Sequence, residues 1–414
     1  MDKKVVVFLL ILISFQPLYA EEFYVHEITT FVSPDSSYTS LSEFIDDADN
    51  SLYISVYEFD DPHIAVLVKG ALQRGVNVEI ILEGKPVGGI SKNERGIIKE
   101  LLGKGAHVYF HGDERINFAH AKYSIADNES LLITSENFGD TGFSKDGSYG
   151  NRGWGIIVED PELASYFVDV FLDDLKDSEK AYVTGKVYID RSTPKGSYRP
   201  RFDSRRYSGT FIVEPIVAPE NAVDAILGLL NSAKRSVYIE QFYIYKYWGS
   251  RIGGSVKASP NLFLEAAIDA ARRGCEVKIL LDSTWYNVKK DDPVSNYHTV
   301  EYVNNVAKEE NLKLEAKLTD LKRAGFVKMH NKGVIVDDEK VLVTSINWNE
   351  NSPTRNREVG VIVHGDVAKY YSDVFMHDWA GKERGVVPYA LLILIGVSLA
   401  LAVIYMSRRR RENR

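Results

Sequence analysis

Apolar runs and amphipathic segments alternate along most of the chain, and their order predicts its secondary structure. Ser51–Phe59 and Val76–Leu82 are rich in β-branched and aromatic residues, which predicts strands. Between them, Ile64–Arg74 has apolar residues at helical spacing and is followed by Gly75, which predicts a helix with a glycine C-cap. Strands that alternate with helices are typical of a mainly parallel sheet covered by helices. We therefore expect an α/β fold.

The same order of elements occurs a second time along the chain. Ala71–Leu82 matches Ala270–Leu281, with glycine on glycine, and Ala164–Phe171 matches Ala368–Phe375. Each copy is much longer than a solenoid repeat, so the pattern indicates a duplication. We expect two similar α/β sandwich halves with mainly parallel sheets, related by a pseudo-two-fold axis.

A change in composition marks the boundary between the halves. The segment 193–208 is polar, basic and contains proline, which predicts a linker. This places the first domain at 21–192 and the second at 209–380. The second half carries extra loop at 246–259 and 285–297.

An apolar run close to the N-terminus has the proportions of a secretory signal peptide. Residues 1–20 begin with a lysine pair, continue as an apolar run and end at the small residue Ala20. Leu18 is larger than the residue preferred at that position before a cleavage site. An uncleaved membrane anchor is therefore the alternative interpretation.

A second apolar run predicts a membrane-spanning helix near the C-terminus. Val386–Met406 contains no charged residue and is long enough to cross a bilayer. Residues 407–414 follow with four consecutive arginines, which predicts a cytoplasmic tail by the positive-inside rule. We expect a single-pass protein of the cell membrane whose catalytic domain lies outside the cytoplasm.

Composition narrows the possible chemistry. The chain has 414 residues and a formal net charge of −8, which argues against a general polyanion-binding surface but allows a local basic cleft. Its single cysteine, Cys275, excludes an intramolecular disulfide and a cysteine-based zinc site. The other candidate ligands show no metal spacing, so we expect neither a metal nor a cofactor.

One polar motif occurs once in each half and carries the candidate chemistry. Each copy has a histidine, a lysine two residues later, an aspartate five residues after that, and then a Thr-Ser-x-Asn segment. The candidate residues are His120, Lys122, Asp127, Ser135 and Asn137 in the first half, and His330, Lys332, Asp337, Ser345 and Asn347 in the second.

The residue types in the motif suit a phosphate diester. On a strand, a histidine and a lysine two residues apart point to the same face. If the halves pack about a pseudo-two-fold axis, two ammonium and two amide groups suit the non-bridging oxygens. Two imidazoles suit a nucleophile and a proton donor. Asp127 and Asp337 precede turn-like residues, so hairpin turns explain these aspartates at least as well as catalysis does.

The duplicated motif resembles the signature of the phospholipase D superfamily, and the resemblance covers roughly residues 30–379. It implies a covalent phosphohistidine intermediate that water or an alcohol resolves without a metal. It assigns His120 as the nucleophile and His330 as the general acid and base. The resemblance also implies a phosphate-binding set, which includes the serine two residues before each asparagine. It places the motif aspartates in the catalytic set. The phosphate-binding set is Lys122, Lys332, Asn137 and Asn347, with Ser135 and Ser345.

The family often has an acidic residue after the motif that contacts a catalytic imidazole. Glu358 fits this position in the second half, whereas its counterpart in the first half is Gly153. We expect Glu358 to orient His120 across the interface, and a surface carboxylate is the alternative. This difference between the halves favours the first half as the nucleophilic one.

The expected substrate has two alternatives. The loops 84–90, 245–259 and 283–297 should lie beyond the carboxyl ends of strands, where ligands bind. Their mixed aromatic and basic residues suit either a phospholipid head group at a bilayer or a single-stranded nucleic acid. The leading hypothesis is a membrane-anchored, monomeric phosphodiesterase or phosphatidyltransferase that acts on phospholipids. An extracytoplasmic nuclease that cleaves single-stranded DNA or RNA is the alternative.

Overall fold

The computed structural model describes residues 21–381. The predicted signal peptide, the predicted membrane span and the predicted basic tail lie outside the described residues. Within 21–381, no helix combines the length and the apolar character that a bilayer crossing requires.

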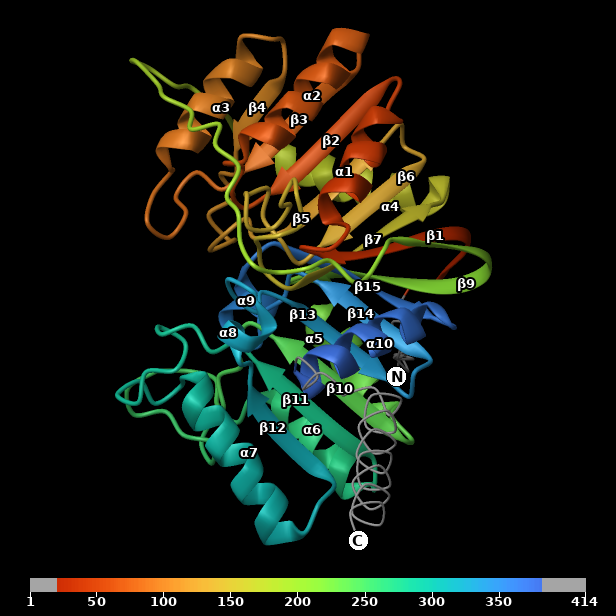
Figure 1. The fold of residues 1–414 in the computed structure, drawn as a ribbon, viewed down its shortest axis with the longest axis vertical. Helices are drawn as coiled ribbons and strands as arrows, with labels where there is room; N and C mark the ends of the chain where they lie inside the picture. The colour runs from red at the N-terminus through yellow and green to blue at the C-terminus, as the bar shows by residue number, and fades with distance from the viewer. Residues whose placement is uncertain (1–20, 382–414) are drawn as a thin grey trace, which may run out of the picture.

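Two sets of elements follow each other along the described chain (Figure 1). The first set is β1 (Phe23–Ser33), α1 (Ser37–Asp46), β2 (Ser51–Val56), α2 (Pro62–Arg74), β3 (Asn77–Leu82), α3 (Lys92–Leu102), β4 (His107–Phe110), β5 (Lys122–Ala126), β6 (Ser130–Thr134), β7 (Gly153–Glu159), α4 (Pro161–Lys176) and β8 (Glu179–Lys180). The second set is β9 (Arg205–Ala218), α5 (Ala222–Asn231), β10 (Ser236–Gln241), α6 (Leu262–Arg272), β11 (Glu276–Leu281), α7 (Asn296–Glu310), β12 (Leu314–Leu318), α8 (Leu321–Ala324), β13 (Lys332–Val336), β14 (Lys340–Thr344), α9 (Asn351–Arg355), β15 (Glu358–His364) and α10 (Val367–Ala380).

All the strands of the described chain belong to one continuous sheet. Its order is β12-β11-β10-β13-β14-β15-β9-β1-β7-β6-β5-β2-β3-β4-β8. Read outward from the central β1–β9 pair, each half has the same order of equivalent strands, and β8 is an addition at one edge. Because β1 and β9 are antiparallel, the two halves run in opposite senses across this pair. The expected duplication is therefore seen in the strand order.

The expectation of a mainly parallel sheet is wrong. The parallel pairs in the described chain are β2–β3, β3–β4, β10–β11 and β11–β12, and the remaining pairs are antiparallel. Helices connect the parallel strands, as the alternating pattern predicts. The motif strands differ because tight turns join β5 to β6 and β13 to β14 as hairpins. The alternation of apolar runs identifies strands, but it does not give their direction.

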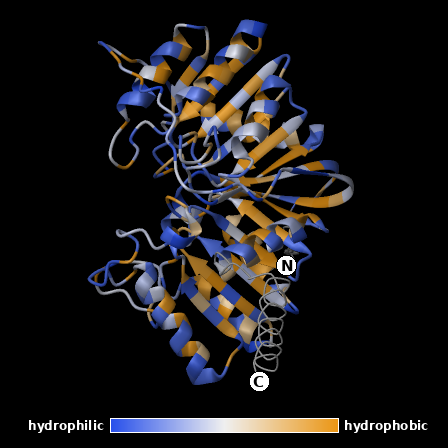
Figure 2. Cartoon of the chain, in the orientation of Figure 1, coloured by the Kyte–Doolittle hydropathy of each residue, from blue (hydrophilic) through white to orange (hydrophobic). Residues whose placement is uncertain are grey.

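Helices cover both faces of the sheet and bury three apolar clusters. Helices α1, α2 and α3 pack on the first half, and α5, α6 and α7 pack on the second. On the opposite face, α4 and α10 pack with strands of both halves in one central cluster. Apolar residues follow the strands, and many outward helix positions are polar (Figure 2). The central cluster holds the two halves together.

The connection between the halves runs from 181 to 204 without a helix or strand. It passes over α3, where a Cβ on Gly96 would meet the Tyr188 carbonyl oxygen at 3.1 Å. The predicted linker, 193–208, overlaps this connection and the first residues of β9. The domain boundaries stay a prediction.

Candidate active site

The two histidines of the motif lie at equivalent places, directly before β5 and β13. The N–H of His120 donates to the carbonyl oxygen of Arg357 at 2.8 Å, and the N–H of His330 donates to that of Arg152 at 2.8 Å. Each of these arginines belongs to the other half of the chain. The structure thus brings the two motifs together across the pseudo-two-fold axis.

Glu358 contacts the imidazole of His120, as expected from the sequence. Its Oε2 lies 2.8 Å from Nδ1 of His120. The carboxylate is fully buried and also accepts hydrogen bonds from the Ser352 hydroxyl and from Nδ2 of Asn356, the latter at 3.1 Å. These contacts hold the carboxylate in place. The carboxylate in turn keeps the proton of the neutral imidazole on Nδ1.

A second carboxylate, which the sequence analysis missed, serves the other histidine. Oε2 of Glu136 lies 3.1 Å from Nδ1 of His330 and accepts a hydrogen bond from Nδ2 of Asn151 at 2.9 Å. Glu136 is the variable residue of the first Thr-Ser-x-Asn segment, and its counterpart in the second half is Ile346. An acidic residue at this position was the available signal.

The glycine at 153 makes room for this second carboxylate. A Cβ at Gly153 would overlap Oε1 of Glu136 and would lie 2.7 Å from Oγ of Ser135. The halves therefore use different sequence positions to place one carboxylate against the imidazole of the other half. The inference that Gly153 leaves His330 without an acidic partner is corrected, so this difference no longer identifies the nucleophilic half.

Burial keeps both imidazoles neutral in the free protein. It lowers the pKa of His120 to about 4, although the charge of Glu358 opposes this shift. Burial, followed by the positive charge of Lys332, lowers the pKa of His330 well below its usual range. A neutral imidazole whose Nδ1 faces a carboxylate presents its other nitrogen, Nε2, as a base or nucleophile.

The motif lysines lie fully buried beside the histidines. Nζ of Lys122 donates to the carbonyl oxygen of His120 at 2.6 Å, and Nζ of Lys332 donates to that of His330 at 2.5 Å. Burial lowers the pKa of Lys122 to about 8 and that of Lys332 well below its usual range. A bound phosphate anion would favour the charged form of both lysines.

The motif asparagines have unused hydrogen-bonding capacity. Nδ2 of Asn137 donates to Glu58 at 2.9 Å, and the backbone N–H of Asn347 donates to Ser352 at 3.0 Å. The Oδ1 atoms of both asparagines are buried and have no hydrogen-bond partner among residues 21–381. Unpaired buried polar atoms of this kind are uncommon outside binding sites.

Ser135 and Ser345 are bonded to the backbone of neighbouring strands. Oγ of Ser135 accepts from the N–H of Trp154 at 3.1 Å, and Oγ of Ser345 accepts from the N–H of Val359 at 3.1 Å. Both serines are fully buried. Their hydroxyl groups therefore connect the motif segments to β7 and β15, and their place in the phosphate-binding set stays a prediction.

Asp127 and Asp337 lie at the opposite ends of β5 and β13 from the lysines. The carboxylate of Asp127 accepts three backbone N–H groups at 2.7–2.8 Å, and that of Asp337 accepts three at 2.6–2.9 Å. Both residues have positive φ, 55° and 59°, as turn residues do. The contacts support the turn interpretation for both aspartates, and their catalytic assignment is left to the kinetic test.

Two aromatic residues that the sequence analysis did not select flank the histidines. The ring of Tyr57 lies 4.8 Å from that of His120, and the ring of Phe242 lies 4.8 Å from that of His330. Tyr57 and Phe242 occupy equivalent positions after β2 and β10. They exclude water from one side of each imidazole, which contributes to the low pKa of both histidines.

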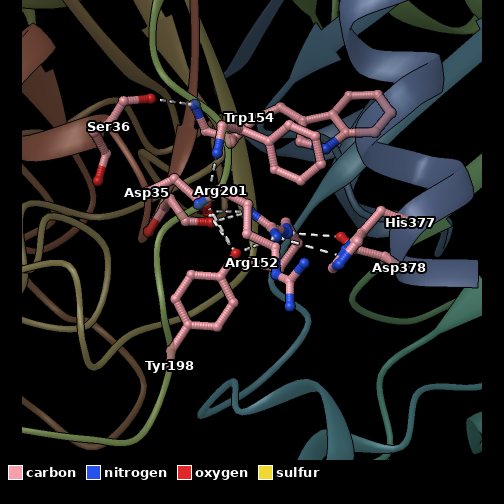
Figure 3. A network of polar contacts seen from close by, with 12 residues as sticks. Asp35, Ser36, Arg152, Trp154, Tyr198, Arg201, His377 and Asp378 are labelled. Carbon is pink, nitrogen blue, oxygen red and sulfur yellow. Dashed lines mark hydrogen bonds and ion pairs between the residues drawn. The ribbon is translucent and has the colours of Figure 1, made fainter. Parts of the chain in front are cut away.

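Buried arginines support the backbone that holds the histidines. Arg152 is fully buried and bonds to Asp35 at 2.7 Å and to Asp378 of α10 at 2.6 Å (Figure 3). Its equivalent, Arg357, bonds to Asp174 of α4 at 2.8 Å. Each arginine thus pairs with a helix of the other half while its carbonyl oxygen accepts the histidine N–H. The repeated Asn-Arg pair after each motif was the sequence signal.

Side chains that could bind a metal ion are not clustered in the described part of the chain. Among residues 21–381, no three His, Cys, Asp or Glu side chains come together in an arrangement that could hold a metal ion.

Both halves of the chain match the same protein family. Residues 41–175 and 226–379 match the family described as cardiolipin synthase, PLD-like domain. A phospholipase D of Rickettsia bellii (strain RML369-C) is 27% identical over 165 residues, which are 40% of this chain and 65% of that protein. The chain therefore spans slightly less than two thirds of this relative.

Two solved structures are also similar. Phosphatidylserine synthase of Haemophilus influenzae Rd KW20 aligns with a TM-score of 0.59 and 14% identity, over 93% of this chain and 96% of that one. A phospholipase D family member, Nuc of Salmonella typhimurium, aligns with a TM-score of 0.34 and 22% identity, over 40% of this chain and 100% of that one. The first of these has a similar fold across nearly the whole described chain.

Proposed function

We propose, because the chain belongs to the phospholipase D superfamily, that it is a phosphodiesterase or phosphatidyltransferase that acts on phospholipids. The carrying observation is the pair of buried imidazoles, each held at Nδ1 by a carboxylate of the other half. Such an arrangement provides one nucleophile and one proton donor on opposite sides of a phosphorus atom.

The proposed reaction has two steps. Nε2 of His120 attacks phosphorus, the bond from phosphorus to the leaving oxygen breaks, and protonated His330 gives its proton to that oxygen. His330 then takes a proton from water or an alcohol, whose oxygen attacks phosphorus and breaks the bond to His120. Both steps conserve protons, and the site returns to its first state.

His330 becomes protonated when the substrate binds. In the free protein, burial and nearby cations disfavour this proton. A phosphodiester anion adds a negative charge beside both imidazoles and both lysines, and a nearby opposite charge raises the pKa of each. The choice of His120 as the nucleophile rests on the family resemblance, because each histidine has an equivalent carboxylate.

The remaining parts of the proposal concern the whole protein. A complete pair of motifs within one chain supports a monomer, since no second copy is needed to assemble the site. The predicted signal peptide and membrane span support a cell-membrane location with the site outside the cytoplasm. A site held close to lipid favours a phospholipid over other phosphodiesters.

The alternative function is a nuclease of the same superfamily, which the aromatic and basic loops beside the site also support. The test compares substrates side by side with the purified protein. Labelled phospholipid vesicles, with a primary alcohol present, are assayed beside single- and double-stranded oligonucleotides. We expect lipid hydrolysis, or transfer to the alcohol. Cleavage of oligonucleotides without any lipid turnover would establish the alternative.

A further inference from the structure

The loops that follow β3 and β11 are tied to the backbone directly before the active-site histidines. Oε2 of Glu83 accepts the N–H of Ala119 at 2.7 Å. In the second half, Oδ1 of Asp282 accepts the N–H of Met329 at 2.8 Å. The other oxygen of each carboxylate accepts an N–H at the start of its own loop. Equivalent buried carboxylates thus fix both loops beside the site.

The same loops also reach the aromatic residues that flank the histidines. The Tyr57 hydroxyl accepts the N–H of Val87 at 2.7 Å, while its ring packs against His120. In the second half, the ring of Tyr286 lies 6.3 Å from that of Phe242, which packs against the second imidazole. Each loop therefore continues the wall of the active site outward.

A third loop, 249–259, joins this edge through an ion pair. Arg251 pairs with Asp292 of the loop after β11, and its guanidinium lies 5.4 Å from the ring centre of Tyr245. In Figure 1 the three loops lie on the left side of the molecule, orange above and green to teal below the junction of the halves. They form one edge around the site.

Large apolar side chains are exposed at the tips of these loops. The exposed fractions are 79% for Val87, 91% for Ile252 and 73% for Trp285. Exposed apolar residues that gather on one surface typically mark an interaction site. We call Val87, Ile252 and Trp285 the apolar rim.

The charge beside the apolar rim is positive, in contrast with the net charge of −8. Lys85, Lys289 and Lys290 are exposed on the same loops. The acidic residues of the loop after β11 are Asp282, which is buried, Asp291, and Asp292, which pairs with Arg251. Apolar tips with neighbouring lysines match the acyl boundary and phosphate layer of a bilayer.

We propose that the apolar rim docks on a phospholipid bilayer, so that a lipid phosphodiester enters the site between the two halves. The inference rests on the proposed function and deepens it, because it specifies that the substrate is taken from a membrane surface. Two of the three tips are aliphatic and offer no ring on which a base can stack. A tryptophan tip suits the bilayer interface.

Fluorescent labels at the tips test the docking directly. Full-length protein with Cys275→Ala and His120→Ala receives one cysteine, at Ile252→Cys or Trp285→Cys, which is labelled with a polarity-sensitive fluorophore. The matched control is Val66→Cys, because Val66 is 51% exposed on α2, at the top of Figure 1. Vesicles contain phosphatidylcholine, phosphatidylglycerol and a lipid with a nitroxide on its acyl chain.

The expected result is quenching at positions 252 and 285 and none at position 66. Equal quenching at all three positions, or at none, would overturn the proposal. A second result would also overturn the proposal. If the tip labels become buried without vesicles, and more so at higher protein concentration, a second copy of the chain covers the apolar rim. The His120→Ala background makes this readout independent of catalysis, so it stands even if phospholipid is not the substrate.

Kinetics provide a second readout in the active protein. Ile252→Ser with Trp285→Ser should lower the rate on vesicles by about tenfold or more relative to the rate on a monomeric short-chain phospholipid. Val66→Ser should leave the ratio of the two rates unchanged. An equal loss on both substrates would show that the tips act on the site itself, and this would overturn the docking proposal.

Discussion

Glu136 contacts His330 across the pseudo-two-fold axis, with Oε2 3.1 Å from Nδ1. The contact mirrors that between Glu358 and His120, yet the two glutamates do not occupy matching sequence positions. The first half has a glutamate within the Thr-Ser-x-Asn segment and a glycine after it. The second half has the reverse, an isoleucine and then a glutamate.

Removing the charge of Glu136 should impair catalysis without unfolding the protein. In Glu136→Gln, the amide no longer fixes the proton of His330 on Nδ1 or stabilises the imidazolium. We expect kcat to fall by about 10²–10⁴-fold, the range for a general acid and base, with little change in KM. Steady-state kinetics measure this, and Glu309→Gln, on the exposed end of α7, is the control. A loss in Glu136→Gln below tenfold would show that the contact is structural only.

The two halves place their glutamates at different sequence positions, and this difference can be tested by itself. Gly153→Ala should displace Glu136, because the new Cβ would overlap its carboxylate. Glu136→Ile combined with Gly153→Glu copies the arrangement of the second half and should recover part of the activity that Glu136→Ile alone loses. Activity of the double variant no higher than that of Glu136→Ile would show that the two positions are not interchangeable.

The pH profile of kcat/KM should reflect the buried charges. Burial lowers the pKa of His120 to about 4 and that of Lys122 to about 8. The neutral imidazole is the reactive form, so activity should rise as pH passes about 4. The charged lysine binds phosphate, so activity should fall above about 8. In Lys122→Arg this position keeps its charge at high pH, since arginine stays charged. A basic limb should nevertheless remain, because the pKa of Lys332 is lowered too. An acidic limb near the usual histidine value would contradict this assignment.

Asp127 should contribute to stability and not to chemistry. Asp127→Ala leaves three backbone N–H groups without their acceptor, which we expect to cost about 1–3 kcal/mol. Burial opposes ionisation of Asp127, but the three N–H groups outweigh it, so its pKa is lowered in the folded state. Its stabilisation is therefore complete above the unfolded pKa and is lost as pH falls through the folded pKa. Urea unfolding at pH 7 and at lower pH measures this.

Kinetics of Asp127→Ala distinguish a structural role of Asp127 from a catalytic one. The folded fraction of Asp127→Ala should retain kcat within a few fold, because the carboxylate lies at the far end of β5 from Lys122. A loss of kcat comparable to that of Glu136→Gln, at unchanged stability, would establish the catalytic assignment of Asp127.

Local patterns predicted much of the fold and about half of the site. The strands and crossover helices follow from apolar spacing, and the buried lysines follow from their position in β5 and β13. The turn residues at Asp127 and Asp337 predicted the motif hairpins. The antiparallel pairing of these hairpins with β2, β7, β10 and β15 was missed, because period-two alternation is the same for both directions. The hydrogen bonds of Ser135 and Ser345 were missed because their partners lie on neighbouring strands, which the sequence does not identify.

Long-range pairs account for the remaining differences. Glu136 and His330 are separated by 194 residues, and Arg152 and Asp378 by 226. The acidic residue at 136 and the repeated Asn-Arg pair mark these positions, but they do not identify the distant partners. The glycine at 153 is a further local signal, since a missing side chain at a repeated position indicates that another group occupies the space.

The central claim is that a histidine of the duplicated motif becomes covalently bound to phosphorus. Rapid acid-free quenching of the protein with a phosphodiester substrate, followed by peptide mass spectrometry, tests it most directly. We expect a phosphoryl adduct on His120 that persists for longer in His330→Ala, because the second step then lacks its base. An adduct on His330 would reverse the assigned roles. Turnover without an adduct on either histidine would contradict the account.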